Sequence, residues 1–245
     1  MPHSLFISDL HLSAKQPRST EVFMHFMQHR APGAEAVYML GDLFESWAGD
    51  DDLDDPFHQR ISHALRTLAA GGTHLFIMHG NRDFLMAEKL AAACNATLLP
   101  DPTLLNLYGT PTLLTHGDAL CTDDAAYQSY RSQVHDPAWQ QQFLSQPLAQ
   151  RKAFIEQLRA RSENEKRHKS SDLMDVSDEA VAGLLREHGY PRLIHGHTHR
   201  AGHILHHVDG RSCERWVLGD WHEVGYALRC SPEGCEDLTV TLPGC

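Results

Sequence analysis

The stretch Tyr38-Met39-Leu40-Gly41-Asp42 is an apolar run that ends in glycine and then in a carboxylate. Such a run is typical of a buried β-strand, and it places Asp42 at the carboxyl end of that strand. Four other apolar runs end in the same manner: 5–8 before Asp9 and His11, 75–78 before Asn81 and Asp83, 112–115 before His116 and Asp118, and 192–194 before His197 and His199. Open α/β sheets carry their sites outside the carboxyl ends of the strands, so these five ends predict one shared site.

The chain has 245 residues, of which 42% are apolar, and a formal net charge of −11. This length and composition allow one full hydrophobic core, so we expect a single folded unit with an insertion. Sequence-independent nucleic-acid binding depends on a basic surface, and the negative charge therefore argues against a nucleic-acid partner. Because the sequence shows neither a secretion signal nor an apolar run that could span a bilayer, we expect a cytoplasmic protein.

The six cysteines form no C-x-x-C pair and no framework spacing; they are Cys94, Cys121, Cys213, Cys230, Cys235 and Cys245. This spacing supports neither a zinc ribbon nor a disulfide scaffold. We therefore expect free thiols in a reducing compartment.

Strand and helix patterns alternate along most of the chain, which indicates an α/β fold. The patterns predict strands at 4–8, 36–41, 73–78, 104–107 and 111–115, and helices at 20–30, 57–70, 86–93 and 177–188, the last capped by Ser177. Turn signals at 208–211 and 231–234 predict two hairpins between residues 192 and 242. We expect these hairpins to supply a second, largely antiparallel sheet, and the whole to be a two-sheet α/β sandwich.

Residues 123–175 are helical and charged, and they are too many for a connection inside a compact sheet. We interpret them as an inserted helical cap, with residues 1–122 and 176–245 forming the core. The alternative is that the apolar residues of this segment pack onto the main body. The acidic loop 45–52 is likewise open to two interpretations, a solvated loop or one that shapes the site.

Aspartate, histidine and asparagine at separate strand ends form a mixed oxygen and nitrogen ligand set, which suits manganese, iron or zinc. The number of candidates fits two ions better than one. We assign Asp9, His11 and His199 to one ion, Asn81, His116 and His197 to the other, and Asp42 as the bridge between them. In such pairs the ions lie about 3.5–4 Å apart.

Taken in order, Asp-x-His, Gly-Asp, Gly-Asn-x-Asp, His-Gly and Gly-His-x-His resemble the calcineurin-like metallophosphoesterase superfamily. The resemblance spans residues 5 to about 222 and implies hydrolysis of phosphate esters or anhydrides with two metal ions. The superfamily usually has histidine where this chain has Arg82, which puts a general-acid role at that position in doubt. A guanidinium stays charged at any working pH and offers a planar fork, so Arg82 suits anion stabilisation better than proton donation.

Segments 40–51, 80–85, 116–124 and 194–200 closely resemble the bacterial UDP-2,3-diacylglucosamine hydrolases of lipid A synthesis. This resemblance implies a manganese-dependent pyrophosphatase with two Mn²⁺ that forms UMP and 2,3-diacylglucosamine 1-phosphate (lipid X) at the cytoplasmic face of the inner membrane. No obligate protein partner is implied. The resemblance further implies catalytic roles for Asn81, Arg82 and His197, and substrate contacts at Asn81, Arg82, Asp124, Tyr127, Ser162, Lys166, Lys169 and His197.

Apolar residues of the predicted cap are candidates for an acyl-chain trough; they are Trp139, Phe143, Leu144, Leu148, Phe154 and Ile155. We expect the cations Arg151, Lys152 and Arg159 to meet anionic lipid headgroups. Two alternatives stay open: a soluble nucleotide pyrophosphatase or phosphodiesterase of the same superfamily, and a metal-dependent scaffold without catalysis. Ligand residues at all seven positions argue against the scaffold.

Overall fold

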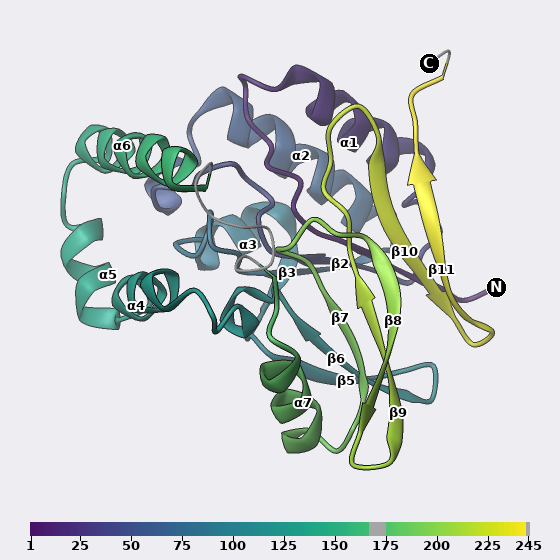
Figure 1. Cartoon of the computed structure of the whole chain (residues 1–245). Helices are drawn as coiled ribbons and strands as arrows, with labels where there is room; N and C mark the ends of the chain where they lie inside the picture. The colour runs from purple at the N-terminus through teal and green to yellow at the C-terminus, as the bar shows by residue number, and fades with distance from the viewer. Residues whose placement is uncertain (167–174, 244–245) are drawn as a thin grey trace.

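Two β-sheets pack face to face, with helices on both outer sides (Figure 1). The computed structural model describes residues 1–166 and 175–243. The first sheet has the order β11-β10-β1-β2-β3-β4 and the second the order β5-β6-β7-β9-β8. The predicted two-sheet α/β fold class is confirmed.

The first sheet is built on three parallel strands that follow each other along the chain. These are β1 (Ser4–Ile7), β2 (Ala36–Leu40) and β3 (His74–Met78), flanked by β4 (Ala96–Leu99), β10 (Gly225–Ser231) and β11 (Gly234–Val240). Its outer face is covered by α1 (Pro17–His29), α2 (Pro56–Ala70) and α3 (Glu88–Cys94). The sequence did not predict β4, because this strand has only four residues of mixed polarity and begins two residues after the end of α3.

The second sheet is mixed and has one helix on its outer face. Its strands are β5 (Thr103–Leu107), β6 (Thr110–Thr115), β7 (Arg192–His195), β8 (Gly202–Val208) and β9 (Arg211–Val217). Strands β6, β7 and β9 run parallel to one another, and β5 and β8 lie antiparallel at the edges. Val181 and Leu185 of α7 (Asp178–Glu187) pack on this sheet.

Alternation along the strands divides the core into layers. Leu5 and Ile7 of β1 face the helices of the first sheet, whereas Phe6 faces the second sheet and packs with Leu40 and Ile194. An apolar inner layer therefore holds the two sheets in contact. Because β1, β2 and β3 in one sheet and β6 and β7 in the other end at the same edge, their following loops meet there (Figure 1).

A helical segment leaves the body between β6 and β7 of the second sheet. It comprises α4 (Ala125–Val134), α5 (Pro137–Leu144) and α6 (Leu148–Lys166), which lie together at one side of the sheets in Figure 1. Short 3₁₀ turns at η1 (Asp50–Asp52) and η2 (Asp118–Leu120) precede α2 and α4. None of the helices in the described residues is long and apolar enough to cross a membrane.

Three predictions about the C-terminal part were wrong or incomplete. The hairpins form as expected, but only β8 and β9 join the second sheet, while β10 pairs with β1 and carries β11 into the first. Ser177 occupies the N-cap of α7 without a side-chain hydrogen bond. Cys230 and Cys235 form a disulfide, because the hairpin register places them directly opposite each other with Cα atoms 4.1 Å apart.

Candidate active site

The loops after the strands turn sharply to bring polar side chains inward. Asp9, His11, Asp42, His197 and His199 all have left-handed backbone conformations, with φ between 49° and 68°. Such conformations are strained for residues other than glycine and persist only where neighbouring contacts hold them. Here the backbone supplies those contacts, since the amides of Asp9 and His11 donate to the carbonyls of Gly41 and Asp42 at 3.1 and 3.0 Å.

Two glycines allow the strand ends to approach so closely. A Cβ atom on Gly41, whose φ is +92°, would lie 2.7 Å from the Cα of Gly80. A Cβ atom on Gly196 would lie 2.7 Å from the Cβ of Ser8, which belongs to the other sheet's loop. Only glycine fits at these positions, so the Gly-Asp and Gly-His motifs are requirements of packing as well as of chemistry.

The first ligand group gathers Asp9, His11 and His199. The Nε2 atoms of the two histidines lie 3.3 Å apart, and Nε2 of His199 lies 3.3 Å from Oδ1 of Asp9. The other oxygen of Asp9 accepts the backbone N–H of His197 at 2.8 Å. Potential ligand atoms of all three residues lie within 4.8 Å of one another.

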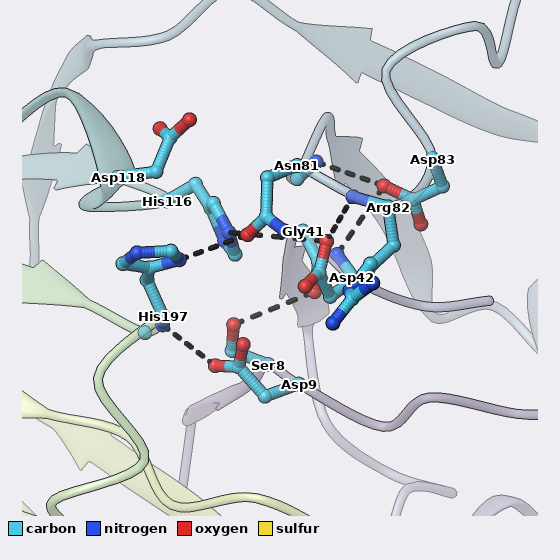
Figure 2. A network of polar contacts seen from close by, with 12 residues as sticks. Ser8, Asp9, Gly41, Asp42, Asn81, Arg82, Asp83, His116, Asp118 and His197 are labelled. Carbon is cyan, nitrogen blue, oxygen red and sulfur yellow. Dashed lines mark hydrogen bonds and ion pairs between the residues drawn. The ribbon is translucent and has the colours of Figure 1, made fainter. Parts of the chain in front are cut away.

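The second group consists of Asp9, Asp42 and His116 and shares Asp9 with the first (Figure 2). Oδ1 of Asn81 lies 3.1 Å from Nε2 of His116 and 2.8 Å from Nδ1 of His197. Nδ1 of His116 donates to the carbonyl of Leu40 at 2.8 Å, because a carbonyl can only accept. The structure therefore brings all seven predicted ligands into one cluster, with Nε2 of His116 facing its centre.

Charge in this cluster perturbs its histidines and carboxylates. Burial lowers the pKa of His116, but the charges of Asp42 and Asp9 outweigh it and raise that pKa to about 9. Burial likewise opposes protonation of His199, yet its contacts with Asp220 and Asp9 raise the pKa to about 10. For Asp9, burial raises the pKa, but the surrounding histidines hold it well below its usual range.

The donor set fits divalent metal ions. Oδ1 of Asp9 is buried and accepts no hydrogen bond from any residue that the structure describes. Buried carboxylate oxygens without a donor are costly, and a cation satisfies them. Two overlapping groups of oxygen and imidazole ligands suit manganese, iron or zinc better than calcium.

A cavity of about 510 Å³ opens directly from the cluster toward α4–α6. Asn81, Arg82 and His197 line its polar end, and its other wall is mostly aromatic and aliphatic, with Phe84, Tyr130, Trp139, Phe143, Phe154, Ile155 and Leu158. Nε of Arg82 is buried and has no hydrogen-bond partner among the described residues. The guanidinium is therefore available to a ligand in this cavity.

Residues 3–201 match the model of one protein family, described as calcineurin-like phosphoesterase. The chain belongs to this family. Relatives of this calcineurin-like phosphoesterase include a protein of Aromatoleum aromaticum, 56% identical over 94% of both chains. Others are from Cellvibrio japonicus, 46% identical over 95% of this chain and 96% of the relative, and Photobacterium profundum, 44% identical over 95% of each. All three relatives carry the name UDP-2,3-diacylglucosamine hydrolase.

Three further predicted substrate contacts of this phosphoesterase line the cavity, namely Asp124, Tyr127 and Ser162. Asp124 also accepts the amide of Tyr127 and so begins α4. The ring of Tyr127 stacks on that of His197, with centroids 5.9 Å apart. Lys166 is the last residue of α6, and the prediction for Lys169 lies outside the described residues.

Sequence reasoning missed the carboxylates that hold the ligands of this phosphoesterase in place. Oδ2 of Asp220 lies 3.1 Å from Nδ1 of His199. Asp83 is fully buried and accepts the amides of Asp42, Phe44 and Gly80 at 3.3, 3.2 and 2.8 Å. Burial and the charge of Asp42 raise the pKa of Asp83 to about 7. Its place in Gly-Asn-x-Asp was the only sequence signal for this role.

Of the three cations predicted to meet lipid headgroups, the prediction is wrong for Arg151, which is buried, and stays a prediction for Lys152 and Arg159. Arg151 is buried and pairs with Asp51 and the carbonyl of Ala48. Nζ of Lys152 lies 2.5 Å from Asp52, and Arg159 pairs with Glu45. The acidic loop pairs with all three side chains and so contacts α6, although Asp51 is itself 54% exposed.

Proposed function

We propose that this chain hydrolyses the pyrophosphate bond of UDP-2,3-diacylglucosamine to UMP and lipid X, a step of lipid A biosynthesis. One observation carries the proposal: a phosphoesterase ligand cluster opens without interruption into an apolar cavity. A substrate with a diphosphate at one end and acyl chains at the other matches that combination. The names and high identities of the relatives support the same substrate.

We further infer that two Mn²⁺ ions are the cofactors. Asp9, His11 and His199 would hold one ion, Asn81, His116 and His197 the other, and Asp42 both. When bound, such ions activate water for attack and offset the negative charge of the phosphates. The mixed carboxylate, imidazole and amide set supports manganese over softer metals.

The remaining chemistry belongs to side chains of the chain itself. Arg82 would bind phosphoryl oxygens through its planar fork, since its Nε has no other partner in the described part of the chain. Its backbone amide donates to Oδ1 of Asp42 at 2.7 Å, which fixes Arg82 beside the cluster. Water adds to one phosphorus while the bridging oxygen leaves with the other phosphate. That phosphate is a good leaving group, so no acid is required at position 82.

We propose that residues 123–175 act as a cap that binds the acyl chains. Trp139 and Phe143 stack with centroids 4.9 Å apart, and Phe154 lies against Phe143 at 5.5 Å. These rings support an apolar trough. Each methylene group moved into such a trough gains about 0.8 kcal/mol, so even part of two acyl chains would dominate substrate affinity.

We also propose that the cap rests on the inner membrane from the cytoplasmic side. Leu144 at the end of α5 and Phe154 on α6 are each 41% exposed, which supports a weak apolar contact. Flotation with lipid vesicles should recover the protein, and Leu144→Ser should reduce that recovery. Equal recovery of both proteins would contradict this proposal.

Product analysis tests the activity. With Mn²⁺, UDP-2,3-diacylglucosamine should yield UMP and lipid X in equal amounts, and chelation of the metal should stop the reaction. The specific alternative is a soluble nucleotide pyrophosphatase or phosphodiesterase. Equal catalytic efficiency on UDP-2,3-diacylglucosamine and on deacylated UDP-glucosamine would favour that alternative, whereas no turnover of UDP-2,3-diacylglucosamine would contradict the proposed activity.

A further inference from the structure

Glu45 lies in the loop after β2 and contacts both a predicted metal ligand and α6. Its Oε2 lies 2.9 Å from Nδ1 of His11, and its Oε1 pairs with Arg159. We propose that Glu45 is a positioning residue that couples the seating of α6 to the orientation of His11. Metal binding at the Asp9, His11 and His199 group then depends on Arg159, through its pair with Glu45. The inference rests on the metal site of the proposed function but not on the identity of the substrate.

The contact with Glu45 indicates which ring nitrogen of His11 carries the hydrogen. The negative charge of Glu45 favours a hydrogen on the nearer nitrogen, Nδ1, which forms no hydrogen bond within the described residues, and so leaves the lone pair on Nε2. Nε2 is the nitrogen that lies 3.3 Å from Nε2 of His199 and 3.8 Å from Oδ2 of Asp42. Carboxylates behind metal-binding histidines fix the tautomer and the ring orientation in this way. Glu45 therefore directs the lone pair of His11 into the ligand group.

Arg159 acts on Glu45 from the opposite side. The side chains of Glu45 and Arg159 are 13% and 25% exposed, so solvent and salt screen their attraction less than at an open surface. Without Arg159, the carboxylate would be left nearly buried without its cation, which is a costly arrangement. Glu45 would then turn toward water and leave Nδ1 of His11.

The loop after β2 contacts α6 at more than one position along the helix. Lys152 and Arg159 are seven residues apart, so they lie on the same side of the helix. Lys152 binds Asp52 and Arg159 binds Glu45, both in the loop after β2. When α6 is packed against this loop, Arg159 therefore contacts Glu45; when α6 is displaced, that contact is lost.

The test measures Mn²⁺ affinity without substrate, by equilibrium dialysis of the full chain. Arg159→Met should weaken binding of one of the two ions by about 10-fold, the lower end of the range for lost partners of metal ligands. Arg159→Lys should restore much of the affinity. Lys15→Met is the matched control, since Lys15 joins Glu156 of the same helix through a pair that is 86% and 71% exposed. Unchanged affinity in Arg159→Met would overturn the proposal.

A double-mutant cycle separates coupling from a plain structural role. Glu45→Gln should weaken the same ion, and adding Arg159→Met should cost little more, because both changes break one connection. Fully additive losses would overturn the proposal. So would a lower melting temperature of the metal-free variants with unchanged Mn²⁺ affinity, which is the result of a purely structural pair. If the wild-type chain binds no Mn²⁺, the metal site of the proposed function fails as well.

Discussion

Asp42 lies between the two ligand groups and is almost completely buried. Its Oδ2 lies 3.8 Å from Nε2 of His11, and its Oδ1 lies 3.9 Å from Nε2 of His116. Asp42→Asn keeps the shape of this side chain but removes the charge that both groups share. We expect a loss of activity of several orders of magnitude and fewer than two bound ions per chain, with an unchanged circular dichroism spectrum. Full activity in this variant would contradict a bridging role.

Within the described residues, the hydrogen bond from Arg82 to the cluster comes from its backbone amide, so its side chain can be tested apart from metal binding. We expect Arg82→Ala to lower kcat about 10²- to 10³-fold, as the loss of one donor to transition-state charge does. Metal content, measured by atomic emission, should stay at the wild-type level. A variant that loses metal together with activity would show that Arg82 acts on the ligands.

Proton release should accompany metal binding. In the metal-free chain the charges of nearby carboxylates raise the pKa of His116 to about 9 and that of His199 to about 10. Both imidazoles must lose a proton to bind an ion. Mn²⁺ affinity should therefore rise with pH up to about 9–10, with protons released below that range. Titration calorimetry in two buffers of different ionisation enthalpy measures the release, and identical heats in both buffers would contradict it.

The same raised pKa values should make the metal-free chain less stable as pH rises, whereas Mn²⁺ binding becomes stronger. Both folded-state values lie above the ordinary histidine value of 6.5. The stabilisation from these protonated histidines is therefore complete below pH 6.5 and disappears as pH rises through about 9 to 10.

The ligands could be predicted from the sequence because each lies just after an apolar strand, and strand ends of this kind converge by topology. The supporting carboxylates could not. Glu45 and Asp220 act on histidines that are distant in sequence, and no local pattern marks such pairs. Their roles depend on how loops from different strands approach one another.

The face of α6 toward the body carries cations that the sequence indicated as lipid contacts. Lys152 and Arg159 are seven residues apart on α6, and each pairs with a side chain of the loop after β2. Core-facing helix surfaces are usually recognised by apolar periodicity. Here the facing surface is ionic, so the sequence predicted a helix but not its orientation, and its cations were interpreted as available to lipid.

Two exposed residues of the cap allow a matched test of the acyl trough. Phe154 and Leu144 are both 41% exposed, but only Phe154 lines the cavity. With a soluble short-chain substrate, Phe154→Ser should lower kcat/KM on the diacylated compound and leave the deacylated compound unaffected. Leu144→Ser should change neither. Equal effects of Phe154→Ser on both compounds would assign Phe154 to packing of the cap.

At the scale of the whole molecule, the five strand ends belong to two sheets, although each was predicted from a local pattern alone. The path of β10 could not be predicted, because hairpin signals fix the pairing of β10 with β11 but not the sheet that receives them. Cys230 and Cys235 show the same limit. Their disulfide follows from hairpin register, whereas cysteine spacing alone indicated free thiols.

The metal site should hold the two sheets together. Asp9, His11, Asp42 and Asn81 follow strands of the first sheet, whereas His116, His197 and His199 follow strands of the second. Bound ions would therefore join both sheets in the folded state and would find no such site in the unfolded chain. Stabilisation by one bound ion reaches about 2.7 kcal/mol when free Mn²⁺ exceeds its Kd 100-fold.

For a chain of this size, that free energy corresponds to a rise in Tm of roughly 5–11 °C. Calorimetric melting with increasing Mn²⁺ should show this rise, and a chelator should reverse it. Asp42→Asn, which lacks the charge shared by both groups, should show a much smaller rise. A Tm that does not respond to Mn²⁺ in the wild-type chain would mean that the ligand cluster does not bind the ion in the folded state, because a ligand that binds only the folded chain must stabilise it.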